Sequence, residues 1–518
     1  MRKVLASLSL LAAALIALAL ATDARVALWQ AGPWQALLLA AGLALAWPDA
    51  RRRAHPALAL PALAMLALLP FAVLLRMHGY VDLVAVRYHL EAGITPMSLQ
   101  VARNPLIVSL WAALSLLLAV HALGRLWGRP GAVALAAALV LGLVNPGLRA
   151  AATAAAVARD PLDLVARIAD PPLPAAPAAP DAPHVVLIYL EGFERAFADR
   201  SRFGDAYAPL ERLGEGGLVL TGIRQIQGTG WSAAGMTATQ CGLPLVPRGA
   251  LFHNMLIAEP AILPGHRCLG DLLATQGYEG TFVVGGEAIF AGISTFYKGH
   301  GGARIVELAD LLDTMTPEEA EAAFPGWVVD DAAVFDAARE EFARGAATGR
   351  PQFLVVETFG PHGPDHLVSR PCTADGRAVV GDDPAAAAAC LARLTEDFVR
   401  ALPPLAGGRP LLVALLSDHL NHDRRLRRNE DARRNTAILI APGLEPGTLT
   451  REGAMIDIYP TLLDLLGMGR ADGRAGLGVS LLRQEPTLVE ELGAERLDDR
   501  IRYDADLRQA IWREAPPP

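Results

Sequence analysis

Charged residues are scarce in this chain of 518 residues, at 19%, whereas hydrophobic residues make up 53%. Disordered chains have the opposite balance, and soluble enzymes of this length are rarely so apolar. Basic residues are also in the minority, because 46 lysines and arginines face 54 aspartates and glutamates and leave a net charge of −8. No basic surface for nucleic acid is therefore expected. The composition excludes disordered, fibrous and purely soluble proteins, and the length predicts two or more domains.

The apolar residues gather in five charge-free windows of 19 to 23 residues in the first part of the chain. This length is enough for a helix to cross a hydrocarbon core of about 30 Å. The first window is alternatively a cleaved signal peptide, because Arg2 and Lys3 precede an apolar run that ends in small residues. Four further windows favour an uncleaved helix, and we predict five membrane spans: Val4–Thr22, Val26–Pro48, Ala54–Leu75, Asn104–Gly124 and Pro130–Leu148.

Basic residues between these windows predict the orientation in a membrane. They fall at alternate ends of successive spans, and so belong to one face: Arg2, Lys3, Arg51, Arg52, Arg53, Arg125 and Arg129. By the positive-inside rule this face is cytoplasmic. The N-terminus is then inside, and everything after Leu148 lies outside the cytoplasm.

An Ala/Pro-rich stretch follows the apolar windows and ends in PPLPAAPAAPDAP at Pro183. Such a stretch is a semi-rigid spacer that cannot build a core. We therefore predict a membrane domain over 1–149, a linker over 150–183, a globular extracytoplasmic domain over 184–485, and a polar, helix-prone tail over 486–518 without an assigned role.

The globular half alternates short apolar runs with helical stretches such as Asp330–Ala343 and Ala385–Leu402. Near-continuous apolar runs are typical of strands that are buried on both faces. The alternation predicts an α/β domain around a largely parallel sheet, with functional residues just past the carboxyl ends of the strands. The expected strands are Val185–Leu190, Thr281–Val284, Phe353–Thr358, Leu411–Leu416 and Ala437–Ile440.

Only four cysteines occur, and all lie in the globular half. An even number in an oxidising compartment predicts two disulfides, although spacing alone allows three pairings. We favour the two pairs that are local in sequence, Cys241–Cys268 and Cys372–Cys390. A Cys/His zinc cluster is the alternative, but no C-x-x-C spacing supports it.

Metal-type ligands follow two of the predicted strands. Glu191 comes directly after VVLIYL, and Asp418-His419 follow LLVALL and Ser417. Carboxylates and an imidazole at strand ends can converge on one divalent cation. A lone glutamate after a strand is more often a solvated loop residue, whereas Asp-His after a buried strand is a stronger indication.

Ser232 lies in the segment GTGWSAAGMTATQCGLPL, where a run of small residues begins a helix. The simpler interpretation is an N-cap, because helix starts prefer serine. The functional interpretation is a nucleophile, since free amides and the helix dipole at this position favour an alkoxide and a bound phosphate.

His362 occupies a turn framed by Gly and Pro in TFGPHGPDH, again directly after a strand. Its ring could contact a phosphoryl oxygen, although an ordinary surface-loop histidine fits the pattern equally well. Weaker candidates for substrate contact are Trp231, Glu287, His300, Asp365 and His366.

Taken together, these residues resemble the alkaline-phosphatase-like sulfatase superfamily. More narrowly they resemble its membrane-anchored head-group transferases, such as lipoteichoic acid synthases and phosphoethanolamine transferases, and above all the phosphoglycerol transferases of osmoregulated periplasmic glucans. MIDIYPTLLDLLG is similar to the final helix of the superfamily. The other segments that carry the resemblance are IYLEGFERAF, GTGWSAAGMTATQCGLPL, CLGDLLATQGY, VGGEAIFAG, HGPDHLVSRPC, LSDHL and GLGVSLL, spread over about 184–482.

The resemblance implies a divalent metal, with Mn²⁺ favoured and Zn²⁺ or Mg²⁺ as alternatives, held by Glu191, Ser232, Asp418 and His419. Ser232 would also be the nucleophile, and His362 would contact the transferred phosphate. The donor would be phosphatidylglycerol and the acceptor a periplasmic glucan at a bacterial inner membrane. The family usually has Thr where this chain has Ser232, so metal geometry and rate are in doubt although the hydroxyl remains.

Three other functions compete with this interpretation. A sulfatase proper needs C/S-x-P-x-R, which neither Cys241-Gly242-Leu243-Pro244 nor Ser369-Arg370-Pro371-Cys372 fits. A phosphoethanolamine transferase would use the same core on another lipid. An inactive membrane sensor that binds lipid or glucan would have no need of all four ligands.

Overall fold

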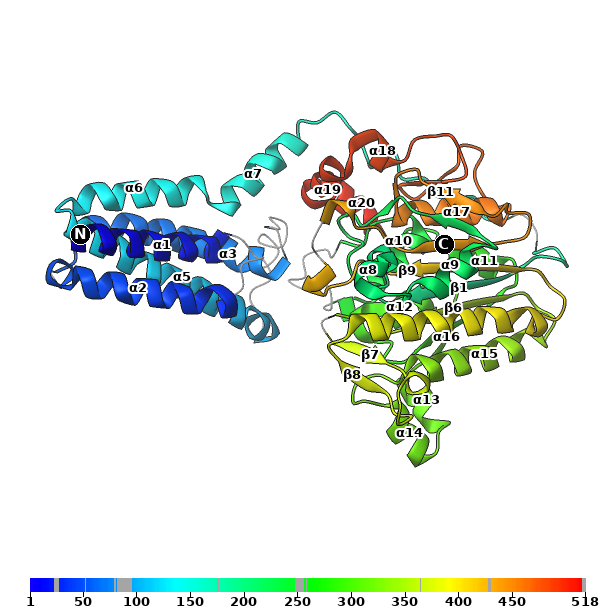
Figure 1. Ribbon diagram of the computed structural model, residues 1–518. Coiled ribbons are helices and arrows are strands. Elements are labelled where there is room, and N and C mark those ends of the chain that lie inside the picture. The colour runs from blue at the N-terminus through cyan, green and yellow to red at the C-terminus, as the bar shows by residue number, and fades with distance from the viewer. Residues whose placement is uncertain are drawn as a thin grey trace. The chain divides into compact units, whose positions relative to one another are not determined.

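The computed structural model describes the whole chain except residues 23–27, 52, 79–80, 82–95, 175–176, 247–255, 258, 364, 427–429 and 515–518. The chain divides into two compact units, both drawn in Figure 1. The first comprises Met1–Pro161, and the second comprises Leu162–Pro247 and His253–Pro518.

Apolar helices make up the first unit. α1 packs against α2 and α5, and α3 packs against α5 and α6. Small residues allow the close contacts: a Cβ atom at Gly42 of α2 would lie only 2.7 Å from Leu10 Cγ of α1. The helices are α1 (Arg2–Thr22), α2 (Leu28–Ala50), α3 (Ala59–His78), α5 (Pro96–Leu126), α6 (Pro130–Leu143) and α7 (Pro146–Val157).

Four helical stretches in the described part of the chain are long and apolar enough to cross a membrane: Arg2–Thr22, Pro56–Leu75, Arg103–Leu126 and Pro130–Val157. The prediction of five spans therefore agrees with the structure for four of them. The exception, Val26–Pro48, forms α2, which contains Gln35 and two prolines and is not among these four stretches. Gln35 Oε1 accepts a hydrogen bond from Trp111 Nε1 at 2.7 Å, whereas its buried Nε2 has no hydrogen-bond partner within the described residues.

The predicted linker 150–183 begins too early. α7 continues to Val157, because alanine is the best helix former and the Asn145 side chain caps the helix through the Gly147 amide at 2.8 Å. The second unit begins at Leu162, and Leu164 already lies in its core. Part of the Ala/Pro-rich stretch is therefore helix and part is core.

An eight-stranded sheet forms the centre of the second unit (Figure 1). β9, β1, β6, β4 and β5 pair in parallel, whereas β10 is antiparallel to both of its neighbours. This confirms the predicted α/β class with a mostly parallel sheet. The strand order is β11 (Gly447–Leu449), β2 (Leu218–Leu220), β10 (Ala437–Ile440), β9 (Leu411–Ser417), β1 (His184–Leu190), β6 (Gln352–Glu357), β4 (Glu279–Val284) and β5 (Arg304–Val306).

Alternate residues of β1 enter the cores on the two faces of the sheet, which explains its continuous apolar run. One face is covered by α9 (Ala208–Gly214), α15 (Asp331–Ala346) and α16 (Pro384–Leu405), of which the last two pack together (Figure 1). The other face is covered by helices that include α10 (Ser232–Cys241), α11 (Leu269–Thr275), α12 (Ile293–Gly299) and α17 (Ile458–Leu465).

The segment 486–518, predicted as a tail, belongs to the second unit. It forms α18 (Leu488–Leu492), α19 (Ala494–Tyr503) and α20 (Ala505–Ile511), whose apolar side chains enter the core. Asp498 of α19 accepts a hydrogen bond from the Gln227 amide at 2.7 Å, just before the Ser232 segment. The segment is polar because much of each helix faces outward, although Arg500 and Arg508 are buried.

Both predicted disulfides are present. Cys241 at the end of α10 is joined to Cys268 at the start of α11, and Cys372 is joined to Cys390 of α16. The alternative of a Cys/His zinc cluster is therefore wrong, because the disulfides use all four cysteines.

Candidate metal and phosphoryl-transfer site

Two neighbouring strands bring the metal-type ligands together. β1 and β9 pair in parallel with Leu190 opposite Ser417, so Glu191 and Asp418 leave the same edge of the sheet side by side. Both side chains are buried, as is that of His419. One ligand atom of each of the three residues lies within 4.8 Å of the others, which makes this a candidate metal site.

The three side chains converge on one point. His419 Nε2 lies 3.0 Å from Glu191 Oε1 and 3.2 Å from Asp418 Oδ2. His419 Nδ1 donates a hydrogen bond to the Leu420 carbonyl at 2.9 Å, which fixes Nε2 as the atom that faces the carboxylates. Asp418 is oriented in turn by its Oδ1, which accepts hydrogen bonds from the Gly192 and His419 amides at 2.9 and 2.8 Å.

Burial and mutual charge dominate the electrostatics of this cluster. Burial opposes ionisation of Glu191, but the charge and hydrogen bond of His419 together with the charge of His362 outweigh burial and hold the pKa of Glu191 well below its usual range. Burial and the Glu191 charge raise the pKa of Asp418 to about 8. Burial lowers the pKa of His419, but the two carboxylates more than reverse this effect and raise it to about 10. His419 Nε2 therefore carries a proton, whose charge balances the two carboxylates as a bound cation would.

The donor set fits a divalent cation. Glu191 Oε1 and Asp418 Oδ2 are buried, and neither accepts a well-formed hydrogen bond within the described residues. Buried oxygens without donors are costly unless a cation or a donor reaches them. Two carboxylates, an imidazole nitrogen and a nearby hydroxyl are ligands that several divalent metals accept.

Ser232 joins the cluster from α10. Its hydroxyl donates a hydrogen bond to Glu191 Oε2 at 3.0 Å. The N-cap of α10 is Trp231, so the N-cap interpretation of Ser232 is wrong: its hydroxyl faces Glu191 instead of the helix amides. Gly235 makes this approach possible, since a Cβ atom there would lie 1.8 Å from the Asp418 carbonyl oxygen.

His362 approaches the cluster from the turn after β6. Its Nε2 lies 3.9 Å from Glu191 Oε1, and its side chain is 33% exposed. The turn is fixed because Asp331 accepts hydrogen bonds from the Phe359 and Gly360 amides at 2.6 and 2.8 Å. The rings of Trp327 and His362 meet in a T-shaped arrangement, with centroids 5.7 Å apart.

A cavity of about 570 Å³ opens beside these residues. It runs over the carboxyl ends of β1, β6 and β4, and its walls are mostly apolar. Of the weaker substrate candidates, Glu287 lines it. Its lining also includes Glu191, Ser232, Phe290, Ile293, Trp327, Glu357 and His362.

The remaining weak candidates do not line this cavity. His300 is buried, with Nδ1 2.7 Å from Asp271 Oδ2 and Nε2 2.7 Å from the Ile262 carbonyl. His366 is buried as well, with Nε2 2.9 Å from Asp423 Oδ2. Asp365 is exposed, and Trp231 precedes Ser232 as the N-cap. His300 and His366 thus form part of the packed structure.

Glu357 and Trp327 are among the lining residues that the sequence did not identify as site residues. Glu357 is the last residue of β6, and the strand prediction Phe353–Thr358 treated it as part of an apolar run. A carboxylate inside a buried strand was the available signal. Trp327 lies in the loop before α15, where a single sequence offers no pattern that marks it.

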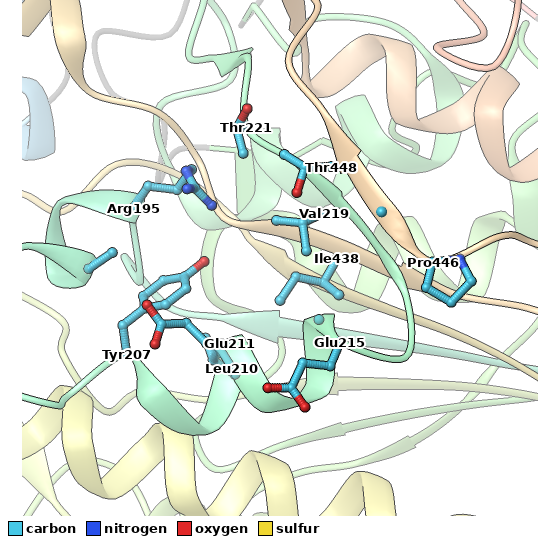
Figure 2. A pocket seen from close by; sticks show the side chains of 13 residues that line it. Arg195, Tyr207, Leu210, Glu211, Glu215, Val219, Thr221, Ile438, Pro446 and Thr448 are labelled. Atoms are coloured by element: carbon cyan, nitrogen blue, oxygen red, sulfur yellow. The ribbon is translucent and has the colours of Figure 1, made fainter.

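A second cavity, of about 490 Å³, lies beyond β10 between α9 and the short strands β2 and β11 (Figure 2). Arg195, Tyr207 and Glu211 are among its lining residues. None of the site residues predicted from the sequence lines it. The chemistry expected from the sequence therefore belongs to the first cavity.

Comparison with known proteins identifies a family model and similar proteins that match this chain. A model of the sulfatase family matches residues 183–468. Phosphoglycerol transferase I of Xanthomonas euvesicatoria pv. vesicatoria is 30% identical over 340 residues, which cover 64% of this chain and 47% of that protein. Phosphoglycerol transferase I of Citrobacter koseri is 30% identical over 310 residues, which cover 58% and 39%. The chain thus spans about half the length of the curated relatives it matches, or less.

Solved structures with a similar fold include an alkaline phosphatase superfamily protein from Vibrio parahaemolyticus, with a TM-score of 0.47 and 22% identity. The match covers 62% of this chain and 78% of that one. The lipoteichoic acid synthase LtaP from Listeria monocytogenes matches with a TM-score of 0.47 and 14% identity, over 64% and 91% of the two chains.

Proposed function

This chain belongs to the sulfatase family, whose model covers residues 183–468, and on that premise we propose that it is a phosphoglycerol transferase. The proposed donor is phosphatidylglycerol, and the acceptor is a sugar hydroxyl of a periplasmic glucan. The observation that carries the proposal is the Ser232 hydroxyl, 3.0 Å from Glu191 beside an Asp418–His419 pair. The names of the relatives support phosphoglycerol as the group transferred.

In this proposal Glu191, Ser232, Asp418 and His419 hold one divalent cation, with Mn²⁺ favoured and Zn²⁺ or Mg²⁺ as alternatives. When bound, such a cation would lower the pKa of the Ser232 hydroxyl and offset negative charge on the phosphoryl oxygens. Glu191 Oε1 and Asp418 Oδ2 support this assignment, because both are buried beside His419 Nε2 and neither accepts a well-formed hydrogen bond within the described residues.

In the first step Ser232 Oγ attacks the phosphorus of the donor. The bond from phosphorus to the diacylglycerol oxygen breaks as the bond to Oγ forms. The proton lost by Ser232, which it shares with Glu191 Oε2 in the resting site, is balanced by the proton gained by the departing diacylglycerol. The N-terminus of α10 and the His362 ring stabilise charge on the phosphoryl oxygens.

In the second step a sugar hydroxyl attacks the glycerophosphoryl-Ser232 intermediate. The new phosphorus–oxygen bond replaces the bond to Oγ, and the sugar proton returns to Ser232. Because both steps are displacements at one phosphorus, positioning and electrostatics supply most of the rate.

The apolar helices of the first unit suit a lipid donor. We place the chain in a bacterial inner membrane as a multi-pass protein, with its N-terminus in the cytoplasm and its catalytic unit in the periplasm. The two disulfides support an oxidising compartment, and the basic residues between the spans support this orientation.

The test is peptide mass spectrometry on the full-length protein in detergent with Mn²⁺ and either phosphatidylglycerol or phosphatidylethanolamine, without acceptor. We expect a glycerophosphoryl mass on the Ser232 peptide from phosphatidylglycerol only. An ethanolamine-phosphate adduct would replace the donor and keep the mechanism. No adduct and no diacylglycerol release, with metal bound, would contradict the proposed function.

Two variants at the nucleophile provide the controls. Ser232→Ala removes the hydroxyl and should abolish both the adduct and diacylglycerol release. Ser232→Thr keeps a hydroxyl and should retain both. Full activity of Ser232→Ala would overturn the mechanism.

A further inference from the structure

Glu357 lies at the floor of the reaction cavity. It ends β6 and pairs in register with Tyr189 of β1 on one side and with Val284 of β4 on the other. Its side chain is 3% exposed and lines the cavity together with Glu191, Ser232 and other residues. None of the metal-type ligands is adjacent to it in sequence.

The Glu357 carboxyl lacks a partner. Its Oε2 is buried without a hydrogen bond, and no hydrogen bond in the described part of the chain reaches this side chain. Two buried acids outside the metal-type cluster are satisfied, by contrast: Asp331 accepts two amide hydrogen bonds, and Asp457 accepts from the Ala454 and Val479 amides. An unsatisfied buried carboxyl is costly, and such a group in a cavity is a candidate for ligand binding.

The surroundings define which ligand group would complement this carboxyl. Burial of the Glu357 carboxyl without a hydrogen-bond partner favours its neutral form. A neutral carboxyl both donates and accepts hydrogen bonds, as a hydroxyl does. An ammonium group would instead require the ionised form, which this environment disfavours.

The order of the strands indicates which part of a bound donor would reach Glu357. Glu191 ends β1, Glu357 ends β6, and the apolar wall with Phe290 and Ile293 lies past β4. A phosphorus atom attacked by Ser232, whose hydroxyl is bonded to Glu191, would lie near the end of β1. A substituent of that phosphorus that extends along the cavity toward β6 would then meet Glu357.

We propose that Glu357 hydrogen-bonds a hydroxyl of the donor's head group and thereby selects glycerol over ethanolamine. This inference deepens the proposed function and rests on it for the identity of the lipid. Glu357 is here a specificity-determining residue that binds the group transferred, separate from the four metal-type ligands.

The test compares three variants of the full-length protein in detergent with Mn²⁺. Glu357→Gln keeps a side chain that donates and accepts, and Glu357→Leu removes both abilities at similar volume. Glu279→Gln is the matched control, because Glu279 begins the neighbouring strand β4 at the opposite end of the sheet and pairs with Arg350. Diacylglycerol release from phosphatidylglycerol and from phosphatidylethanolamine gives KM and kcat for each donor.

We expect Glu357→Leu to raise KM for phosphatidylglycerol about tenfold and to lower the preference for it over phosphatidylethanolamine by a similar factor. Glu357→Gln and Glu279→Gln should stay within about threefold of the wild type. Metal content should be unchanged in all three variants. The Tm of Glu357→Leu should not fall, because it removes an unsatisfied buried group.

Three results would overturn the inference: an unchanged KM and donor preference in Glu357→Leu, an equal loss in Glu357→Gln, or loss of metal from both Glu357 variants. The second would indicate that the carboxylate charge is required, and the third would make Glu357 part of the metal site.

Calorimetric binding of glycerol phosphate and of phosphoethanolamine to the Mn²⁺-loaded protein separates this inference from the proposed function. If no lipid is turned over, the proposed function fails. A preference for glycerol phosphate that is weakened about tenfold in Glu357→Leu would still support the inference. Equal binding of the two compounds, or binding unaffected by Glu357→Leu, would contradict it.

Discussion

Two clusters among the described residues of the second unit have the composition of a metal site. Only one of them has buried side-chain atoms, left without a hydrogen-bond partner, that could bind a metal. Glu191, Asp418 and His419 form the first, and Cys268, Asp271 and His300 form the second. In the second cluster Cys268 is bonded to Cys241, and both nitrogens of His300 have hydrogen-bond partners. Asp271 also accepts a hydrogen bond from the Cys268 amide at 2.9 Å and so caps α11.

The difference lies in unsatisfied bonding capacity. The first cluster has two buried carboxylate oxygens without a proper donor, whereas Asp271 Oδ2 serves an amide and an imidazole at once. Proximity of ligand-type side chains is therefore common to a binding site and to a helix cap. Buried groups that lack partners distinguish the two.

The strongest test of this contrast is a matched pair of amide substitutions. Glu191→Gln should remove bound metal and reduce transferase activity by at least about 10³-fold, because it neutralises a metal ligand and changes the partner of Ser232. Asp271→Asn should keep both within about twofold. Elemental analysis and diacylglycerol release measure the two effects. Equal metal loss in both variants would refute the contrast.

Truncation of the two histidines should separate stability from metal binding. His300→Ala leaves the Ile262 carbonyl and Asp271 without their partner and should lower the free energy of unfolding by about 2–4 kcal/mol, with metal content unchanged. His419→Ala also leaves buried carboxylates without their partner in metal-free buffer, and it should in addition lose bound metal. Denaturant unfolding and elemental analysis of both variants are the measurements, and metal loss from His300→Ala would contradict the contrast.

The pH dependence of metal binding follows from the raised pKa of His419, about 10 in the metal-free cluster. Burial alone would lower this pKa, but Asp418 and Glu191 raise it, so the ring carries a proton at neutral pH that a metal must displace. Binding should therefore release protons, and affinity for Mn²⁺ should rise with pH by up to about tenfold per pH unit for each proton released. Calorimetry in two buffers of different ionisation enthalpy measures the protons. An affinity that is flat from pH 6 to 8 would contradict this expectation.

The smallest effect is expected at Trp327, whose ring orients His362 from outside the cluster. Trp327→Ala should lower kcat/KM about three- to tenfold, and Trp327→Phe should stay within about twofold because an aromatic ring remains. Both variants should keep their metal. A loss of metal in either would place the indole in support of the cluster itself.

The central strands were predictable because they are buried on both faces. Val185–Leu190 and Leu411–Leu416 correspond to β1 and β9 within one residue at each end. The short strands β2, β5 and β11 have three residues each, too few for a period to appear. The segment 486–518 was expected to be helix-prone, but its place in the globular unit was missed because its composition is polar, while residues such as Leu497 and Trp512 enter the core.

The sequence predicts those site residues that directly follow a strand or begin a helix. Glu191, Ser232 and Asp418 follow such positions, and the structure brings them together. His300 and His362 could not be told apart, because a histidine's role depends on where its two nitrogens lie. The partners of His300, the Ile262 carbonyl and Asp271, become visible only in three dimensions.

Helix α10, which carries Ser232, is fastened near both ends. Close to its start, Gly235 rests on the Asp418 backbone, and its last residue, Cys241, is covalently joined to α11. A rod fixed at two points resists both rotation and sliding, so the nucleophile stays still while substrates come and go. The lipid must therefore adopt the reactive orientation itself. The freedom of motion that it loses on binding becomes the main entropic barrier to attack.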